Sequence, residues 1–219
     1  MARVVLIGVV HGEPGAEERL LRLLREIGPR TVGLEVSTFS IDFRRRHGER
    51  LRALLERRVA RLGLGGHEGP ISWLRRYLDV PFEWAASERF ARETGAEILA
   101  LGDPRAAAGF LDLVEEELLA AESLARGFAS GAAEADVESA KRRARRLFSE
   151  PDRYVFAGDR HLLAWRDSAA ALALRKRASE LPGDAAVAYV AGFEHVLVRG
   201  DVPNVGRALA DLSPERILL

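Results

Sequence analysis

The sequence predicts an α/β domain with a mixed central sheet and flanking helices. Short apolar runs at residues 4–10, 31–36 and 186–191 have the character of buried strands, and segments of helical periodicity separate them. The two ends of the chain also repeat one order of features: strand, Gly-x-x-His, loop, helix, strand. We therefore expect two pseudo-symmetric β-loop-α-β units at the chain ends and a helical insertion between them.

The first unit is the better defined of the two. Residues 16–27 carry Leu20, Leu24 and Ile27 on one helical face, and Gly28-Pro29 ends the periodic pattern. A strand–helix–strand order favours parallel pairing, so we expect the strand at 31–36 to lie beside the strand at 4–10.

The remainder of the chain is predicted to be mostly helical. We expect one domain over residues 1–219, with helical insertions at 37–95 and 104–160 on either side of a short strand at 96–101. The predicted helices cover residues 44–62, 71–78, 81–94, 106–126, 133–148 and 159–181, and the last strand is expected at 216–219.

Composition excludes several classes of function. Lys plus Arg and Asp plus Glu are both 33, so no net field recruits nucleic acid or an anionic membrane. No segment approaches the roughly 20 apolar residues that span a bilayer. Cysteine is absent, which leaves His, Asp and Glu as the strong metal ligands. We expect a cytoplasmic protein with a small-molecule partner.

Two Gly-x-x-His corners follow predicted buried strands, Gly8 to His11 and Gly192 to His195. In α/β sheets ligands bind beyond the carboxyl ends of strands, so both histidines are candidate site residues. The alternative is a strand-end histidine that only bonds a backbone carbonyl. A third match ends at His161 near a helix start; it either supports the site or is structural.

Four further polar residues are candidates. Glu35 lies within an apolar strand, where a carboxylate must be paired or bind a metal. Asp103 precedes Pro104, so it either joins the site or caps a helix. Arg166 and Asp167 lie on the helix before the last buried strand, where the arginine either stabilises a substrate oxyanion or pairs with an acid.

These features together resemble the TraB/PrgY/GumN/Tiki family, within a grouping that includes the EreA and ChaN proteins. The resemblance covers residues 3–37 and 160–219, with the Gly102-Asp103 segment between them. It implies metal-dependent peptidase-like hydrolysis as in Tiki proteins, or esterase-type hydrolysis as in EreA. Pheromone inactivation and iron- or haem-linked roles are implied for PrgY-type and ChaN members.

The resemblance also assigns roles to residues. It puts His11, Glu35 and His195 at the metal or acid–base positions, and Arg166 with Asp167 at the helix pair. The chain departs from the family pattern at Ala170-Ala171, where Met-Ala is usual, and it shows no signal or membrane segment.

We therefore expect a hydrolase for a small peptide or ester, aided by Mn²⁺, Co²⁺ or Zn²⁺ or working without a metal. In the metal version His11, Glu35 and His195 are the ligands. The competing expectation is a non-catalytic ligand-binding or regulatory protein on the same fold. A third interpretation uses the charged helices at 44–62 and 106–148 as an interaction surface, for instance in a homodimer.

Overall fold

The computed structural model describes residues 1–129, 137–150, 160–197 and 204–219. Five strands form one sheet in the order β3-β2-β4-β1-β5, and every pairing is parallel. The strands are β1 (Arg3–Val9), β2 (Thr31–Leu34), β3 (Glu97–Ala100), β4 (Ala186–Gly192) and β5 (Glu215–Leu218). The α/β class with flanking helices is confirmed. The sheet is parallel rather than mixed, because each connection between successive strands includes a helix that returns the chain to the same edge.

The strands of the two end units alternate in the sheet. Strand β4 lies between β1 and β2, so the expected direct pairing of β1 with β2 is wrong. The connection from β1 to β2 passes over β4, and that from β4 to β5 passes over β1. The four strands β2-β4-β1-β5 are therefore arranged symmetrically about the β1–β4 pair, and β3 adds a fifth strand beside β2. In that pair Val9 is opposite Gly192, so both Gly-x-x-His corners leave the sheet side by side.

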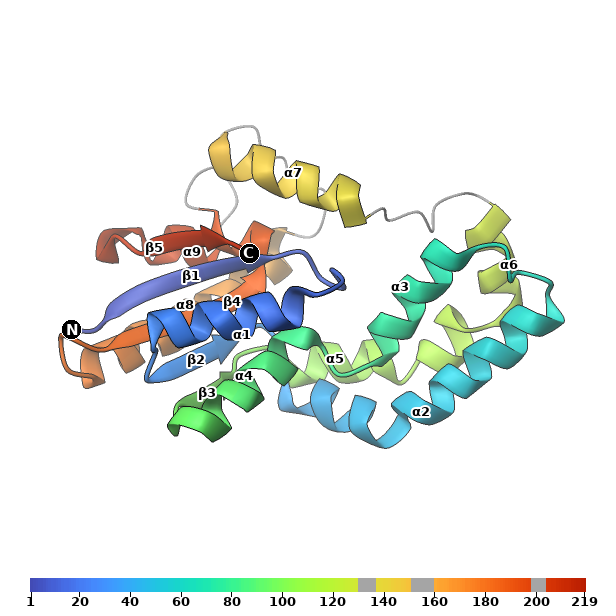
Figure 1. The fold of residues 1–219 in the computed structure, drawn as a ribbon, viewed down its shortest axis with the longest axis horizontal. Helices are drawn as coiled ribbons and strands as arrows, with labels where there is room; N and C mark the ends of the chain where they lie inside the picture. The colour runs from blue at the N-terminus through green and yellow to red at the C-terminus, as the bar shows by residue number, and fades with distance from the viewer. Residues whose placement is uncertain (130–136, 151–159, 198–203) are drawn as a thin grey trace.

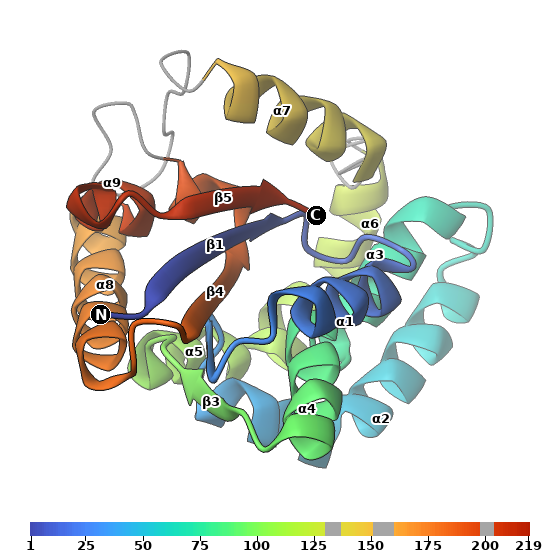
Figure 2. The same cartoon turned by 60° about the vertical axis from the view of Figure 1, so that its left-hand side comes forward.

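Helices cover both faces of the sheet (Figure 2). On one face α1 (Ala16–Ile27) and α4 (Phe82–Thr94) bury Leu20, Leu24 and Phe90 against β1, β2 and β4. On the other face lie α8 (Arg160–Glu180) and the short α9 (Val205–Ala208). Each fully buried large side chain contributes about 1.5–3 kcal/mol, so these two layers stabilise the sheet below the site.

Four of the remaining helices form a lobe at the carboxyl edge of the sheet, toward which the strand arrows point (Figure 1). It contains α2 (Thr38–Arg61), α3 (Glu68–Leu78), α5 (Pro104–Leu111) and α6 (Ala121–Ala129), packed around a separate apolar core. Helix α2 begins six residues before the expected start at 44, because the Ser37 side chain accepts a hydrogen bond of 3.1 Å from the Ser40 N–H and caps it.

The long helix expected at 106–126 is wrong. In its place α5 is followed by one π-helical turn, η1 (Val114–Leu118), and then by α6. Leu111 at the end of α5, Val114 in the turn and Leu119 directly after it all pack into the core of this lobe. Helix α7 (Val137–Ser149) matches the next predicted helix over its described part.

Between β4 and β5 the chain also forms two 3₁₀ turns, η3 (Phe193–Val196) and η4 (Ala210–Leu212). None of the helices in the described ranges is both long enough and apolar enough to cross a membrane.

Candidate active site

Three of the candidate residues meet at the carboxyl edge of the sheet. His11 follows β1, Glu35 follows β2, and His195 lies in η3 directly after β4. Nε2 of His195 is 2.9 Å from Oε1 of Glu35, and Nε2 of His11 is 3.7 Å from Oε2 of the same carboxylate. Glu35 is therefore the centre of the cluster, with one imidazole on each side. The insertion of β4 between β1 and β2 puts the three strand ends next to one another.

The glycines of the two corners have different roles. The N–H of Gly192 donates a hydrogen bond of 2.9 Å to Oε2 of Glu35. A Cβ at Gly192 would lie 2.8 Å from Nε2 of His11, so only glycine lets the two corners approach this closely. A Cβ at Gly8 would instead strike Phe148 and Val196, which makes that glycine a packing requirement away from the carboxylate.

The Nε2 atom of each histidine faces Glu35, and its Nδ1 atom contacts a second carboxylate. Nδ1 of His195 is 2.7 Å from Oδ1 of Asp167, whose other oxygen accepts the N–H of Val205 at 3.2 Å. Nδ1 of His11 is 2.7 Å from Oε1 of Glu83 on α4. These bonds fix the ring orientations and direct both Nε2 atoms toward Glu35.

Sequence reasoning identified Asp167 but missed Glu83. The signal for Glu83 is its position on the buried face of α4, which it shares with Ala86, Ser87 and Phe90. A carboxylate at that spacing needs a buried partner, and His11 is that partner.

The other sequence candidates are placed as follows. Arg166 donates a hydrogen bond of 3.1 Å to Oε1 of Glu35, so it pairs with an acid, which was one of the two roles expected for it. Asp103 caps α5 by accepting the N–H of Arg105 at 2.8 Å, and it also lies in the wall of the cleft described below. The side chain of His161 lies outside the described residues.

The electrostatics of the cluster are strongly coupled. Burial by itself raises the pKa of Glu35, but the charge and hydrogen bond of His195, with the charge of His11, bring it well below its usual range. Burial lowers the pKa of both histidines, and the carboxylates outweigh it. Glu83 and then Glu35 raise the pKa of His11 to about 9. Glu35 and Asp167 raise the pKa of His195 to about 10. At neutral pH Glu35 is an anion between two imidazolium rings.

The cluster opens into a cleft with two lobes. One lobe, of about 470 Å³, reaches His11 and Glu83 and is bounded by α3 and the start of α4. The second, of about 420 Å³, reaches Asp103 and Arg166. Both lobes reach Glu35. The His11 side chain is 60% exposed and that of His195 is 12% exposed. His11 is thus the histidine that a molecule in the cleft can contact directly.

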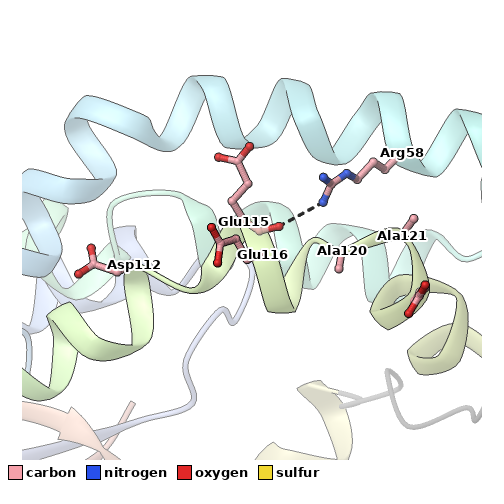
Figure 3. A pocket seen from close by; sticks show the side chains of 7 residues that line it. Arg58, Asp112, Glu115, Glu116, Ala120 and Ala121 are labelled. Atoms are coloured by element: carbon pink, nitrogen blue, oxygen red, sulfur yellow. Dashed lines mark hydrogen bonds between the residues drawn. The ribbon is translucent and has the colours of Figure 1, made fainter.

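Another cavity of similar size lies far from this cluster, between α2 and the segment from α5 to α6. Figure 3 shows that the carboxylates of Asp112, Glu115 and Glu116 point in different directions there rather than toward one point. The Glu115 carboxylate is paired with Arg50 at 2.6 Å, and Arg58 donates to the Glu115 carbonyl at 3.2 Å. This cavity has no acid–base geometry comparable to that at Glu35.

The side chains of His11, Glu35 and His195 are of types that bind divalent ions. A carboxylate bonded to the other nitrogen of each ring is also typical of metal-binding histidines. As placed, the oxygens of Glu35 already accept hydrogen bonds from Gly192 and Arg166 and contact His195. Across the described ranges, no three His, Asp or Glu side chains are placed to hold an ion. An ion between His11, Glu35 and His195 would have to displace part of this network.

Comparison with known proteins adds no identification: the chain matches no protein-family model, no curated protein and no solved structure. The function must therefore be argued from the site.

Proposed function

We propose that the protein is a hydrolase that cleaves an ester or peptide bond by acid–base catalysis at Glu35 and His11. One observation carries this proposal. Oε2 of Glu35 and Nε2 of His11 are 3.7 Å apart at the wall of the cleft, too far for a direct hydrogen bond. Both atoms are within reach of one oxygen placed beside the gap, which is how a base and an acid share a reacting water or substrate oxygen.

The roles follow from charge and exposure. Glu35 is the ionised carboxylate, so it orients the attacking water and takes up its proton as His11 gives up its own, which removes one of the charges that lower the Glu35 pKa. His11 is the imidazolium that substrate reaches, so it donates a proton to the leaving oxygen or nitrogen. Arg166 uses one nitrogen on Glu35 and lines the second lobe, where its other N–H groups can stabilise the oxyanion.

His195 and Asp167 act as positioning residues in this scheme. The two side chains are 12% and 4% exposed, so they support Glu35 from within the protein rather than touch substrate. Their hydrogen-bonded chain fixes Oε1 of Glu35 and leaves Oε2 turned toward His11.

The experiment is a hydrolysis screen with p-nitrophenyl esters and short peptides, using the chain and its His11→Gln variant. We expect a loss of kcat of about 100-fold or more, since general acid–base groups contribute about 10²- to 10⁴-fold. The matched control is His47→Gln, on α2 and outside the cleft walls, which should retain activity. Equal activity of all three proteins on a cleaved substrate would refute the assignment.

A metal-dependent form of the same hydrolase is the second candidate, favoured by the carboxylates behind both rings. His11, Glu35 and His195 would hold Mn²⁺, Co²⁺ or Zn²⁺, and such an ion supplies an activated water when bound. Metal analysis of untagged protein, with activity measured before and after chelation, decides between the two forms. Unchanged activity in the chelator favours the metal-free scheme.

Three broader proposals accompany the hydrolase, on family membership, location and oligomeric state. Membership of the TraB/Tiki grouping is supported by the convergence of both Gly-x-x-His corners on Glu35, with Arg166 and Asp167 attached to the cluster. A cytoplasmic location and an optional homodimer are proposed with it. A non-catalytic ligand-binding or regulatory protein would retain the same cleft and fail every hydrolysis assay.

A further inference from the structure

We propose that the cleft lobe beside His11 binds an anionic group of the substrate through Arg44 on α2 and Arg76 on α3. The inference rests on the proposed function, because it names the class of ester or amide that the site would cleave. Both arginines line the lobe that reaches His11 and Glu83. Arg44 also lines the second lobe, so it lies where the two lobes meet.

The guanidinium of Arg76 has a hydrogen-bond donor, Nε, that no described residue accepts. Its Nε is buried and has no hydrogen-bond partner in the part of the chain that the structure describes. A buried donor without an acceptor is unfavourable, so proteins rarely leave one unless a water or a ligand completes it. A Cβ placed at Gly12 would lie 3.4 Å from this Nε, so the guanidinium is next to the turn that follows His11.

Arg44 is satisfied only by neutral groups. Its Nε donates to the Tyr77 carbonyl at 3.0 Å and one terminal nitrogen to the Ser40 carbonyl at 3.2 Å. Its guanidinium carbon also lies 5.2 Å from the centre of the Tyr77 ring. Burial lowers the pKa of Arg44, and the interactions with Tyr77, followed by the charge of Glu83, offset this effect only in part. The guanidinium is held in position by carbonyls and a ring and has no carboxylate among the described hydrogen-bond partners.

The carboxylates that line the same lobe are each engaged by another cation. Their partners are as follows: Glu13 with Arg19 and Lys141, Glu17 with Arg89, Glu35 with Arg166, Asp79 with Arg52, and Glu83 with His11. Among the described residues, none of these acids forms a hydrogen bond with Arg44 or Arg76. A fork of two guanidinium groups facing a cleft favours a carboxylate or phosphate, because each can accept paired N–H bonds.

The surroundings of Arg44 define the rest of the ligand. Trp73 and Tyr77 are stacked at 5.4 Å, and Phe110 packs edge-on to Tyr77 at 5.9 Å. These rings line the two lobes and leave Phe110 54% exposed. The ligand class is therefore an ester or amide that carries an anionic group on a flat apolar body.

The binding test uses benzoate, phenyl phosphate and the neutral isostere benzamide, titrated calorimetrically into the wild-type protein and two variants. We expect at least one anion to bind, benzamide not to bind, and Arg76→Gln to weaken anion binding about tenfold or more. The preferred anion identifies the group as carboxylate or phosphate. The matched control is Arg75→Gln on the same helix, whose guanidinium pairs with Glu56 at 2.6 Å and should not matter. Equal binding of benzamide, or unchanged anion binding by Arg76→Gln, overturns the proposal.

A second measurement separates this proposal from the proposed hydrolase. The p-nitrophenyl monoester of succinate and p-nitrophenyl propionate differ in one carboxylate. We expect a lower KM for the succinate ester in wild type and the loss of that preference in Arg76→Gln. Hydrolysis of both esters with equal KM overturns the anion site and leaves the hydrolase standing. Anion binding that depends on Arg76, with neither ester cleaved, retains the anion site and refutes the hydrolase.

Discussion

Nε2 of His195 lies 2.9 Å from Oε1 of Glu35, so a side chain after β4 and one after β2 form a direct ionic contact at the sheet edge. Nδ1 of the same ring contacts Asp167 at 2.7 Å. Together with His11, Glu83 and Arg166, these groups form a network of three cations and three anions. The balanced charges explain how so many ionised side chains share one sheet edge, because each carboxylate lies beside a positive group.

This network makes stability depend on pH. In the folded protein the pKa of His11 is about 9 and that of His195 about 10, against 6.5 without the fold. A raised pKa adds stability that is complete below pH 6.5 and disappears as the pH rises through the folded values. The lowered pKa of Glu35 adds stability that is present above its ordinary 4.5 and lost as the pH falls below it. These groups therefore favour maximal stability between about pH 5 and 6.5.

Urea unfolding of the metal-free protein at several pH values between 4 and 10 measures this profile. His195→Gln should be less stable at pH 6 and should lose less stability between pH 7 and 10 than wild type. An alkaline decline of the same slope in both proteins would show that His195 is not responsible.

Gly192→Ala should damage the site more than the fold. The new Cβ would lie 2.8 Å from Nε2 of His11 and 3.5 Å from Oε2 of Glu35, so the ring must move away from the carboxylate. We expect kcat to fall about tenfold or more, since small misplacements of catalytic groups are costly. The cost in stability should be about 1–3 kcal/mol, as for other overpacked sites.

Gly8→Ala is the matched comparison for that variant. The nearest atoms to its Cβ would be side-chain atoms of Phe148 and Val196, at 2.8 and 2.9 Å, rather than atoms of the cluster. Thermal melts and kcat measured on both variants should show a loss of stability in each and a large loss of kcat only in Gly192→Ala. The reverse order of kcat losses would contradict the assigned roles.

Glu83→Gln should lower the pKa of His11. The amide can still bond Nδ1, but it removes the nearest negative charge that raises the pKa of the ring. If His11 is the acid, activity in wild type declines as the pH rises through about 9, and the variant shifts this decline to lower pH. Histidine NMR titration and the pH dependence of kcat/KM measure both quantities. An activity that rises through the same pH range would make His11 the base instead.

Local signals in the sequence were sufficient for much of the fold. Helix α1 has the predicted bounds because its apolar stripe and Gly28 define it without help from distant residues. The break at Val114–Leu118 escaped prediction, since it depends on which side chains the α2–α3 core accepts. The position of β4 between β1 and β2 is likewise a property of the assembled sheet.

The site follows the same division. Both corners were recognisable because histidines directly after buried strands are conspicuous, and Glu35 because it was a carboxylate expected within an apolar strand; in the structure that strand ends at Leu34. Glu83, Arg44 and Arg76 were not recognisable from the sequence. Charged residues on helices are common, and only the folded protein shows which of them line the cleft. Their pairing with the strand ends joins segments that no sequence pattern links.

Asp167→Asn should reveal how far the cluster depends on its supporting carboxylate. Asp167 is buried, holds Nδ1 of His195 and accepts the N–H of Val205 at the start of α9. The amide retains one acceptor oxygen but carries no charge, so the pKa of His195 falls. The ionic contact between His195 and Glu35 then weakens. Breaking a buried ion pair costs about 3–5 kcal/mol, and loss of such a supporting partner typically reduces activity about 10- to 100-fold.

Thermal unfolding, kcat and KM measured together test that expectation. A positioning role predicts that kcat falls while KM stays near the wild-type value, because Asp167 does not reach the cleft. The control is Asp211→Asn, which removes an exposed carboxylate paired with Arg175 at 2.7 Å. This change should leave kcat, KM and the unfolding temperature near their wild-type values. A folded Asp167→Asn protein with wild-type kcat would show that Glu35 is held adequately by Gly192 and Arg166 alone.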